Sequence, residues 1–523
     1  MMALKSNTMY LPLFLLLIYT FAGSWIHTPA EGARILAVET VGGKSHWNFM
    51  SAILQTLVDN GHNITVFTPF ANGNRENYTE VDTSMGSVRI LDMQLKEMID
   101  KYGNPITVIS EMSGMSRMLC NVVYENSKMK EILASTRSDF DIVLIEPILS
   151  ECVSYLAVKL NLPLIYIMPI PTMGIMERKL TGHMSNPAVV SLNIAKFGTP
   201  KTFAQKSINI AYLVYCTVAH TFNELILKFT EPQEYDLHAP IPPSLTFVNR
   251  HFTIEPASPI ASNVIEIGGI HLKAPKKLPK DILEFIEQSP HGVVYFTFGS
   301  TIKMSSLPEQ IKKTFIESLA QIPHRVLLKY EDELEPMPKN VMTKKWLPQR
   351  EILLHPKVKL FISHGGISGL YEAIDGGVPV LGFPLFGDQA RNIDNLVNAE
   401  MTISMDIFSV TKDTFLKNVL KLLNNEKYMK NAKTASKIFK DRYMSPTSLV
   451  VYWTEYVLRH KGAPHLKSYA LNQPWYQYYL LDLIAVILVF IVVIFVVIGK
   501  IFKSISKYFL NYSKNTNTKS KSE

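Results

Sequence analysis

The sequence predicts an α/β protein made of two doubly wound halves that face a cleft, followed by one C-terminal transmembrane helix. Short apolar runs alternate with stretches of helical pattern from Ala33 onward. This alternation restarts after a proline-rich stretch, and a long apolar run lies near the C-terminus. Fully apolar strands that alternate with helices are typical of a parallel sheet covered on both faces.

The first half is expected to begin with a strand in RILAVET, followed by the loop GGKSHWN and a helix to about Asn60. Gly61 should end that helix, and HNITVFTP is the next expected strand. The same order returns in DIVLIEP, a helix over about 151–160, and LPLIYIMP. The segment 173–237 breaks this pattern. It is apolar and mostly helical in pattern, so it could line a hydrophobic pocket or form ordinary core helices.

The second half follows a proline-rich stretch from Asn249 to Pro290, which suits a linker between domains. Expected strands then lie in GVVYFTFGS, HRVLLKY, VKLFISHGG and VPVLGFP, with helices beginning at about Pro308 and Asp388. Two joined halves of this kind enclose a cleft, and ligands of such folds bind at the carboxyl ends of the strands.

The two ends of the chain predict a type I membrane protein. A lysine, an apolar run from Tyr10 to Ala22 and small residues after it are typical of a secretory signal peptide, although a buried helix or an uncleaved anchor is the alternative. The run Leu480–Ile498 is long enough to span a bilayer. Aromatic residues precede it and lysines follow it, which predicts a luminal main part and a cytosolic tail.

The charge of the chain argues against nucleic-acid binding. Its net charge is +8, but the tail from Gly499 alone holds six lysines and one glutamate, which leaves the rest near neutrality. The final residues K-S-K-S-E resemble a retrieval signal for the endoplasmic reticulum. Of two glycosylation sequons, Asn77 in a polar loop is the better acceptor, because Asn63 should lie in a buried strand.

Metal and disulfide chemistry have little support in the sequence. Three cysteines cannot make a disulfide scaffold and lack zinc-site spacing. Asp139 and Asp141 form a D-x-D pair, which can hold a metal, but they begin a strand and so lie at the wrong end for a site. No G-x-G-x-x-G follows either first strand, which weakens a dinucleotide-dependent oxidoreductase. We therefore expect no metal site and no cofactor.

The run from Trp346 to Asn392 carries the strongest chemical signal. It reads W-L-P-Q, then H-G-G-I-S-G-L-Y-E, then G-V-P, then F-P-L-F-G-D-Q-A-R-N. His364 and two glycines connect a strand directly to a helix. The N–H groups at the start of that helix favour the binding of an anion such as a diphosphate. Glu372 can accept from ribose hydroxyls and Trp346 can stack on a base, so the spacing fits a nucleotide-sugar site.

This run resembles the signature of the UDP-glycosyltransferase family, of the animal type bound to the membrane of the endoplasmic reticulum. The resemblance covers essentially the whole chain, from GGKSHW through FTFGS to P-W-Y-Q-Y-Y-L-L-D and the lysine tail. It implies the GT-B fold, with two Rossmann-like domains. It also implies inverting, metal-independent transfer of glucose or glucuronate from a UDP-sugar, as co-substrate, to a hydroxyl of a small lipophilic acceptor.

The resemblance also implies roles for single residues. Trp346 would stack on uracil and Gln349 would bind its edge, while Ser300 and His364 would contact the diphosphate, Glu372 the ribose, and Asp388 with Gln389 the transferred sugar. The UDP-sugar site would be lined by Ser300, Trp346, Gln349, His364, Gly366, Ser368, Gly369, Glu372, Asp388 and Gln389. Ser368 stands where many members carry Asn, and Gly369 at a variable position.

The catalytic base implied by the resemblance is His46, at the helix start after the first strand. Its neutral imidazole would take the proton of the acceptor hydroxyl. An acidic partner is expected after the DIVLIxx strand, at Glu146 or Glu151. We prefer Glu146, which ends the strand at the cleft.

The expected organisation follows from these features. In order along the chain, the segments are a signal peptide (1–24), an acceptor-binding domain (33–248), a linker (249–290), a UDP-sugar-binding domain (291–460), a membrane-proximal segment (461–479), a transmembrane helix (480–498) and a cytosolic tail (499–523). Two other functions stay open: a non-catalytic paralogue that binds lipophiles, and a UDP-sugar-dependent enzyme acting on lipid or protein glycans. The donor sugar, the acceptor and a homo-oligomeric state are not fixed by the sequence.

Overall fold

The computed structural model of the chain describes residues 32–86, 99, 105–135, 139–300, 302–332 and 337–519. The chain divides into two compact units, 1–467 and 468–523, which we describe separately. The predicted signal peptide (1–24) lies outside the described residues, as do the last four residues of the proposed retrieval signal.

The first sheet of the large unit has seven parallel strands in the order β3-β2-β1-β4-β5-β6-β7. Its central strands are almost wholly buried, as their apolar sequences predict. The strands are β1 Arg34–Val38, β2 Asn63–Thr68, β3 Tyr78–Asp82, β4 Ile142–Ile145, β5 Leu164–Met168, β6 Leu245–Val248 and β7 Val264–Glu266.

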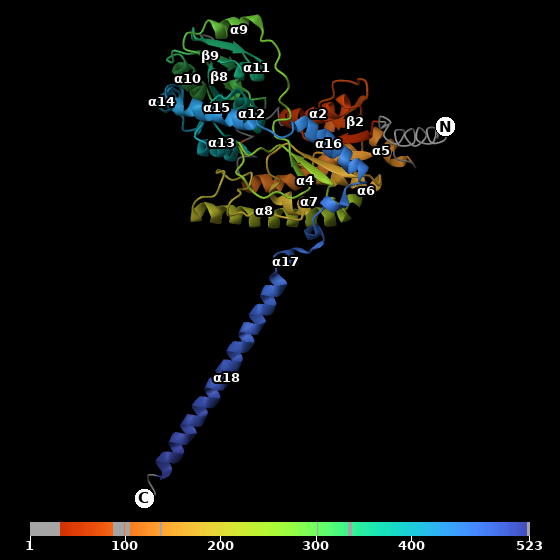
Figure 1. Ribbon diagram of the computed structural model, residues 1–523, viewed down its shortest axis with the longest axis vertical. Helices are drawn as coiled ribbons and strands as arrows, with labels where there is room; N and C mark the ends of the chain where they lie inside the picture. The colour runs from red at the N-terminus through yellow and green to blue at the C-terminus, as the bar shows by residue number, and fades with distance from the viewer. Residues whose placement is uncertain are drawn as a thin grey trace, which may run out of the picture. The chain divides into compact units, whose positions relative to one another are not determined.

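The second sheet has six parallel strands in the order β10-β9-β8-β11-β12-β13. Figure 1 shows helices α9 to α15 gathered around it. The strands are β8 Val293–Thr297, β9 Arg325–Lys329, β10 Val341–Lys344, β11 Val358–Ser363, β12 Val380–Gly382 and β13 Thr402–Ser404. The two sheets confirm the predicted pair of parallel α/β halves.

Helices cover both faces of each sheet. Successive side chains of a strand point to opposite faces, so each sheet packs into a separate core on either side. Along β1, for example, Ile35 packs into one core and Leu36 into the core on the opposite face. The helices of the large unit are α2 Lys44–Asp59, α4 Pro105–Tyr124, α5 Ser127–Ala134, the 3₁₀-helix η3 Glu151–Tyr155, α6 Leu156–Lys159, α7 Glu177–Thr181, α8 Phe203–Thr230, α9 Lys280–Glu287, α10 Glu309–Leu319, α11 Gln349–Leu353, α12 Ile367–Gly376, α13 Gln389–Asn398, α14 Lys412–Asn424, α15 Glu426–Lys440 and α16 Pro446–Arg459.

The predicted domain boundaries are wrong at two places. The proposed linker 249–290 contains β7, which pairs with β6 and completes the first sheet. The proposed UDP-sugar domain 291–460 includes α16, but the buried Leu449, Val450 and Val457 of that helix join the first sheet's core. The chain therefore returns to its first half at the end, and the apolar face of α16 is buried there rather than against the second sheet.

Smaller expectations have mixed outcomes. Asn63 is exposed at the first residue of β2, so its predicted burial is wrong, and Asn77 is exposed as expected. The segment 173–237 is helical only in part, because residues 183–202 form no helix. One disulfide joins Cys120 of α4 to Cys152 of η3, a pairing that the sequence analysis did not predict.

The small unit contains α17 Trp475–Tyr478 and the long α18 Leu481–Lys519. Residues 481–512 are long and apolar enough to cross a membrane, which agrees with the predicted span. The helix does not stop at Ile498, however, and the predicted tail is helical as far as Lys519. No proline follows Ile498, so no residue there prevents helical hydrogen bonding from continuing. Within the described residues, α8 is the second helix that meets the same length and apolarity criteria.

Candidate active site

A cavity of about 270 Å³, here called the central cavity, lies where the carboxyl ends of strands from both sheets meet. Its wall contains residues that follow β1 and β5 of the first sheet and residues at the carboxyl ends of β8, β9 and β11 of the second sheet. Of the predicted site residues, the wall includes His46, Ser300, Trp346, Gln349, His364, Gly366, Ser368, Gly369, Glu372, Asp388 and Gln389. The structure thus brings the predicted base and the predicted UDP-sugar site into one cavity.

The first turn of α2 presents His46 to the central cavity. Nδ1 of His46 lies 2.5 Å from Oε1 of Glu146, which follows β4 and is fully buried. The His46 side chain is 22% exposed, so its ring can reach a ligand while the carboxyl behind it is closed off from water. This His46–Glu146 dyad has the base-and-orienter arrangement used in general base catalysis.

The electrostatics of the dyad depend on a second buried carboxyl. Glu39, directly after β1, is fully buried, and burial together with Glu146 raises its pKa well above the usual value. Burial raises the pKa of Glu146 to about 8. Burial lowers the pKa of His46, against the opposing effects of Glu39 and Asp388. The sequence analysis missed Glu39, although an acidic residue at the carboxyl end of the first strand is a usable signal.

Glu151, the alternative partner, does not lie beside His46. It begins η3, faces a different cavity and lies 3.9 Å from Nζ of Lys179. In the D-x-D pair, Asp141 accepts hydrogen bonds from Arg34 just before β4. Among the described residues, no group of three or more His, Cys, Asp or Glu side chains is placed to hold a metal ion.

One part of the central cavity is built around His364, the residue predicted to contact the diphosphate. β11 ends at Ser363, Gly365 has φ +90°, and Gly366 is the N-cap of α12. A Cβ added at Gly366 or Gly299 would lie 2.6 Å from the imidazole of His364, so both positions need glycine. Among the residues that the structure describes, the buried Nδ1 of His364 has no hydrogen-bond partner. Burial and nearby Lys329 lower the pKa of His364 to about 4, so the ring is neutral near pH 7.

Lys329 is a cation of this wall that the sequence analysis missed. It is the last residue of β9, and its ammonium group lies 2.9 Å from the carbonyl oxygen of Gly299 and 2.9 Å from Glu331. Its side chain is only 11% exposed, and its ammonium lies 6.0 Å from the ring centroid of Trp346. Its place at the carboxyl end of a strand was the available signal, since ligands of this fold class bind at that edge.

Another part of the cavity wall combines an open aromatic face with a buried carboxyl. Trp346 is 70% exposed. Gln349 donates from Nε2 to Glu372 at 2.5 Å and accepts from the Tyr295 hydroxyl at 3.2 Å. Burial raises the pKa of Glu372 to about 7. A Cβ at Gly369 would lie 3.2 Å from Nε2 of Gln349, so this glycine leaves room for the amide.

The remaining predicted residues with described polar contacts are Gln389, Asp388 and Ser368. Gln389 is buried and its amide oxygen accepts from the backbone of Leu385 and Phe386, so contact with a sugar hydroxyl would come from its amide nitrogen. Asp388 accepts from Asn392 at 2.7 Å, and burial raises its pKa. The carbonyl oxygen of Ser368 lies 3.1 Å from Nε2 of His271.

A family profile described as UDP-glucoronosyl and UDP-glucosyl transferase matches residues 33–516. The chain belongs to this family. UDP-glucosyltransferase 2 of Dactylopius coccus is 37% identical over 480 residues, which cover 89% of this chain and 92% of that protein. UDP-glucuronosyltransferase 2B13 of Oryctolagus cuniculus is 30% identical over 477 residues, or 85% and 88% of the two chains. The chain is therefore a glycosyltransferase.

Solved structures agree on the fold. The glycotransferase of kitacinnamycin has a TM-score of 0.53 at 17% identity, covering 81% of this chain and 99% of its own. Glycosyltransferase VinC, solved in complex with DTDP, also has a TM-score of 0.53, at 15% identity, with coverage of 82% and 100%. These matches, with the two parallel sheets, confirm the GT-B fold.

The UDP-glycosyltransferase has a second large cavity, here called the side cavity, of about 300 Å³. Much of its wall is apolar. Methionines and isoleucines after β5 line it, and α8 forms another part of it. Its polar groups include Glu151, Lys179 and His220, and burial with nearby lysines lowers the pKa of His220 to about 4. Ile170 lines both the side cavity and the central cavity.

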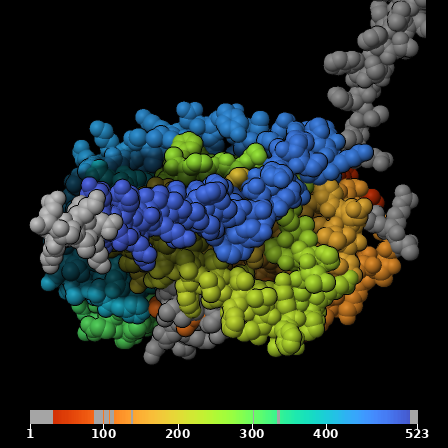
Figure 2. All heavy atoms as spheres, turned by 90° about the horizontal axis from the view of Figure 1, so that it is seen from below, coloured from red at the N-terminus to blue at the C-terminus, as the bar shows by residue number. Residues whose placement is uncertain are grey.

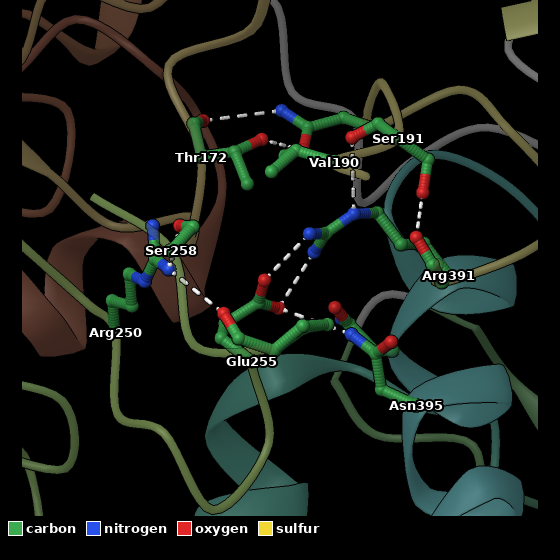
Figure 3. A network of polar contacts seen from close by, with 12 residues as sticks. Thr172, Val190, Ser191, Arg250, Glu255, Ser258, Arg391 and Asn395 are labelled. Carbon is green, nitrogen blue, oxygen red and sulfur yellow. Dashed lines mark hydrogen bonds and ion pairs between the residues drawn. The ribbon is translucent and has the colours of Figure 1, made fainter. Parts of the chain in front are cut away.

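A buried ion pair fixes the start of α13 in the transferase. Figure 3 shows Arg391 held between Glu255 and Ser191. The Arg391 guanidinium donates to both oxygens of Glu255 at 2.6 and 2.5 Å and to the Ser191 carbonyl at 3.2 Å. Both charged side chains are 1% exposed, and Asn395 adds a contact of 3.3 Å to Glu255. Segments around residues 191 and 255 are thereby tied to the helix that begins at Gln389.

Proposed function

We propose that the enzyme transfers glucose or glucuronate from a UDP-sugar to a hydroxyl of a small lipophilic acceptor, with inversion and without a metal. The observation that carries this proposal is the contact of Glu146 with His46, which lines the same cavity as the residues of the UDP-sugar signature. The glucosyl and glucuronosyl transferases among its relatives support the choice of sugar.

The proposed chemistry is one in-line displacement. Ionised Glu146 accepts from Nδ1 of His46 and leaves Nε2 of the ring as the base. Nε2 takes the proton of the acceptor hydroxyl while its oxygen forms a bond to the anomeric carbon. The bond from that carbon to the diphosphate breaks, and UDP leaves with the electron pair. Because attack and departure occur on opposite faces, the anomeric configuration inverts.

The charges that develop in this step have partners in the cavity. The imidazolium formed on His46 is stabilised by the adjacent Glu146 carboxylate. The departing diphosphate would meet Lys329, His364 and the N-terminal N–H groups of α12. Glu372 would accept from the ribose through carboxylate lone pairs other than the one that accepts from Gln349.

The side cavity is the proposed acceptor site, because its wall is mostly apolar and it shares Ile170 with the central cavity. A hydroxyl that advances past Ile170 would approach His46. The second candidate, a non-catalytic lipophile-binding protein, would need no base, and the short contact of the dyad favours catalysis over it. An enzyme that acts on lipid glycans would need room for a larger headgroup than the side cavity offers.

We also propose that the large unit lies in the lumen of the endoplasmic reticulum, anchored by α18. The Cys120–Cys152 disulfide supports an oxidising compartment, and Asn77 is exposed for glycosylation. Aromatic residues before α18 and lysines after Ile498 support the same orientation.

The test is release of UDP by the purified full-length chain in detergent micelles, with a panel of small phenols and with UDP-glucose or UDP-glucuronate. The wild type should turn over with one of these donors and retain its rate in EDTA. His46→Ala should lose about 10²–10⁴-fold in kcat, the usual size of a general base contribution. His465→Ala, a histidine bonded to Tyr456 outside both cavities, is the matched control. Equal rates for wild type and His46→Ala would refute the assigned base, and no turnover with any acceptor would favour the binding protein.

A further inference from the structure

The long helix α8 has its polarity reversed relative to an ordinary surface helix. Ten large apolar side chains of this helix are exposed: Phe203, Ile208, Ile210, Val214, Tyr215, Val218, Phe222, Leu225, Ile226 and Phe229. Val214, Val218, Phe222, Leu225 and Phe229 follow one another at intervals of three or four residues and so share one face. An amphipathic helix on a soluble protein turns such a face toward the core.

The face of α8 that points into the protein is the polar one. The side chain of Asn209 is fully buried, donating to the carbonyls of Pro187 and Val190 and accepting from the N–H of Leu192. Farther along the same face, His220 and Glu224 line the side cavity. The helix therefore forms a polar cavity wall on one side and an apolar outer surface on the other.

We propose that the outer face of α8 lies in the surface of a lipid bilayer, as a second membrane contact besides α18. All residues of α8 are described, and its only exposed charged side chain is Lys206, in the first two turns. Phe203 and Phe229, at its two ends, are 88% and 89% exposed. In Figure 2 the yellow to lime-green atoms of this part of the chain lie at the surface of the large unit.

A bilayer suits this face better than the other occupants do. An apolar helix face that lies flat in the headgroup region, with its polar side turned away from the lipid, is the usual arrangement of interfacial helices. The same chain carries α18, whose residues 481–512 are apolar enough to cross a membrane, so lipid is available to α8 without a separate partner. A second copy of the chain on this face is the alternative that the experiment must exclude.

The consequence for the enzyme rests on the proposed function. Thr221 and Leu225 line the side cavity, whereas Val218 and Phe222, one turn away on the same helix, do not. A lipophilic acceptor dissolved in the bilayer would thus be one helix away from its binding site. We infer that such acceptors enter from the lipid alongside α8, and that His220 and Glu224, the polar groups that α8 presents to the otherwise apolar cavity, select those that carry a hydroxyl or another polar group.

The location of the helix can be measured without any turnover. A spin label is attached to Phe222→Cys of the full-length chain in phospholipid vesicles, and its collisions with oxygen, which concentrates in lipid, and with a water-soluble nickel complex are compared. The control label is at Phe408→Cys, a residue that is 59% exposed on the second half. The wild-type chain gives the background, since Cys216, its one free cysteine, is buried.

The label at residue 222 should favour oxygen over nickel several-fold more than the label at residue 408. Equal ratios at the two positions would overturn the proposal, because the face would then lie in water. Shielding from both reagents, with dipolar broadening between labels, would also overturn it, because a second copy would then cover the face.

The access route has its own test. The double variant Val218→Glu with Phe222→Glu should raise KM several-fold for a long-chain alkylphenol in vesicles, leave kcat unchanged, and leave KM for a water-soluble nitrophenol unchanged. Phe408→Glu is the matched control. An unchanged KM for the alkylphenol would refute entry from the lipid. If no chain transfers sugar to either phenol, the proposed function fails while the spin-label result stands.

Discussion

Replacing Glu255 with Gln should destabilise the whole catalytic unit. The change removes the charge that faces Arg391, whose guanidinium makes contacts of 2.6 and 2.5 Å to the carboxylate. Because both side chains are 1% exposed, water cannot replace the lost partner. Breaking a buried ion pair by removing one member costs about 3–5 kcal/mol. At about 2–4 °C per kcal/mol for a large domain, Tm should fall by about 6–20 °C.

The assay is thermal unfolding of the full-length chain in detergent micelles, followed by initial rates against UDP-sugar concentration. The donor KM should rise, since Arg391 positions the helix that begins with Gln389. The double variant Glu255→Leu with Arg391→Leu should recover much of the lost stability, because a buried pair replaced by apolar residues is often neutral.

The control for this prediction is Glu455→Gln, whose partner Arg459 lies 3.1 Å away, since the two side chains are 43% and 50% exposed. An exposed pair contributes at most about 1 kcal/mol, so Tm should barely move. A Glu255→Gln variant that melts within about 1 °C of the wild type would refute the reasoning. So would a double Leu variant that loses the sum of the two single losses.

Three further predictions concern the dyad, the donor site and the disulfide. In the wild type, kcat/KM should rise with pH through an apparent pKa near 8, because buried Glu146 must be ionised before His46 can act as base. Glu146→Gln should lower kcat about 10²-fold or more and move the rise in kcat/KM to lower pH. Glu372→Gln should raise the donor KM and abolish a rise in KM below about pH 7, where the wild-type carboxyl gains its proton. Removing the Cys120–Cys152 disulfide, which closes a separation of 32 residues, should cost about 3–4 kcal/mol of unfolding free energy.

Initial rates over a pH series measure the first two predictions, and thermal or denaturant unfolding measures the third. A pH limb unchanged by Glu146→Gln would disconnect this carboxyl from the base. A Glu372→Gln variant that alters kcat but not the donor KM would place Glu372 in the chemical step instead of ribose binding. A chain with Cys120→Ala and Cys152→Ala that unfolds like the wild type would show that the bridge adds no stability.

Features with a local pattern could be predicted from the sequence. The alternation of buried strands and helices gave the two sheets, and the close spacing from Trp346 to Gln389 allowed a single cavity to be expected. The choice between Glu146 and Glu151 needed geometry, because both follow the same strand within a few residues. Only the fold shows that the first points at His46 and the second into the side cavity.

Features that depend on distant parts of the chain were not predictable. Lys329 and Glu39 have no motif around them, and their place at the carboxyl end of a strand indicates the edge of the sheet but not the groups that each side chain contacts. The pair of Glu255 and Arg391 joins positions 136 residues apart. The sequence does not show that α16 packs against the first sheet, because its apolar residues could be buried in the core of either half.

The sharing of Ile170 by both cavities has a practical meaning for engineering the enzyme. The Ile170 side chain lies where an acceptor hydroxyl would pass from the side cavity into the central cavity and approach the anomeric carbon of the donor. A shorter residue there would widen the passage for bulky or secondary alcohols, and a larger one would restrict it to slender primary alcohols. Substrate scope could then be tuned at a single position without changing the residues that we propose to bind UDP.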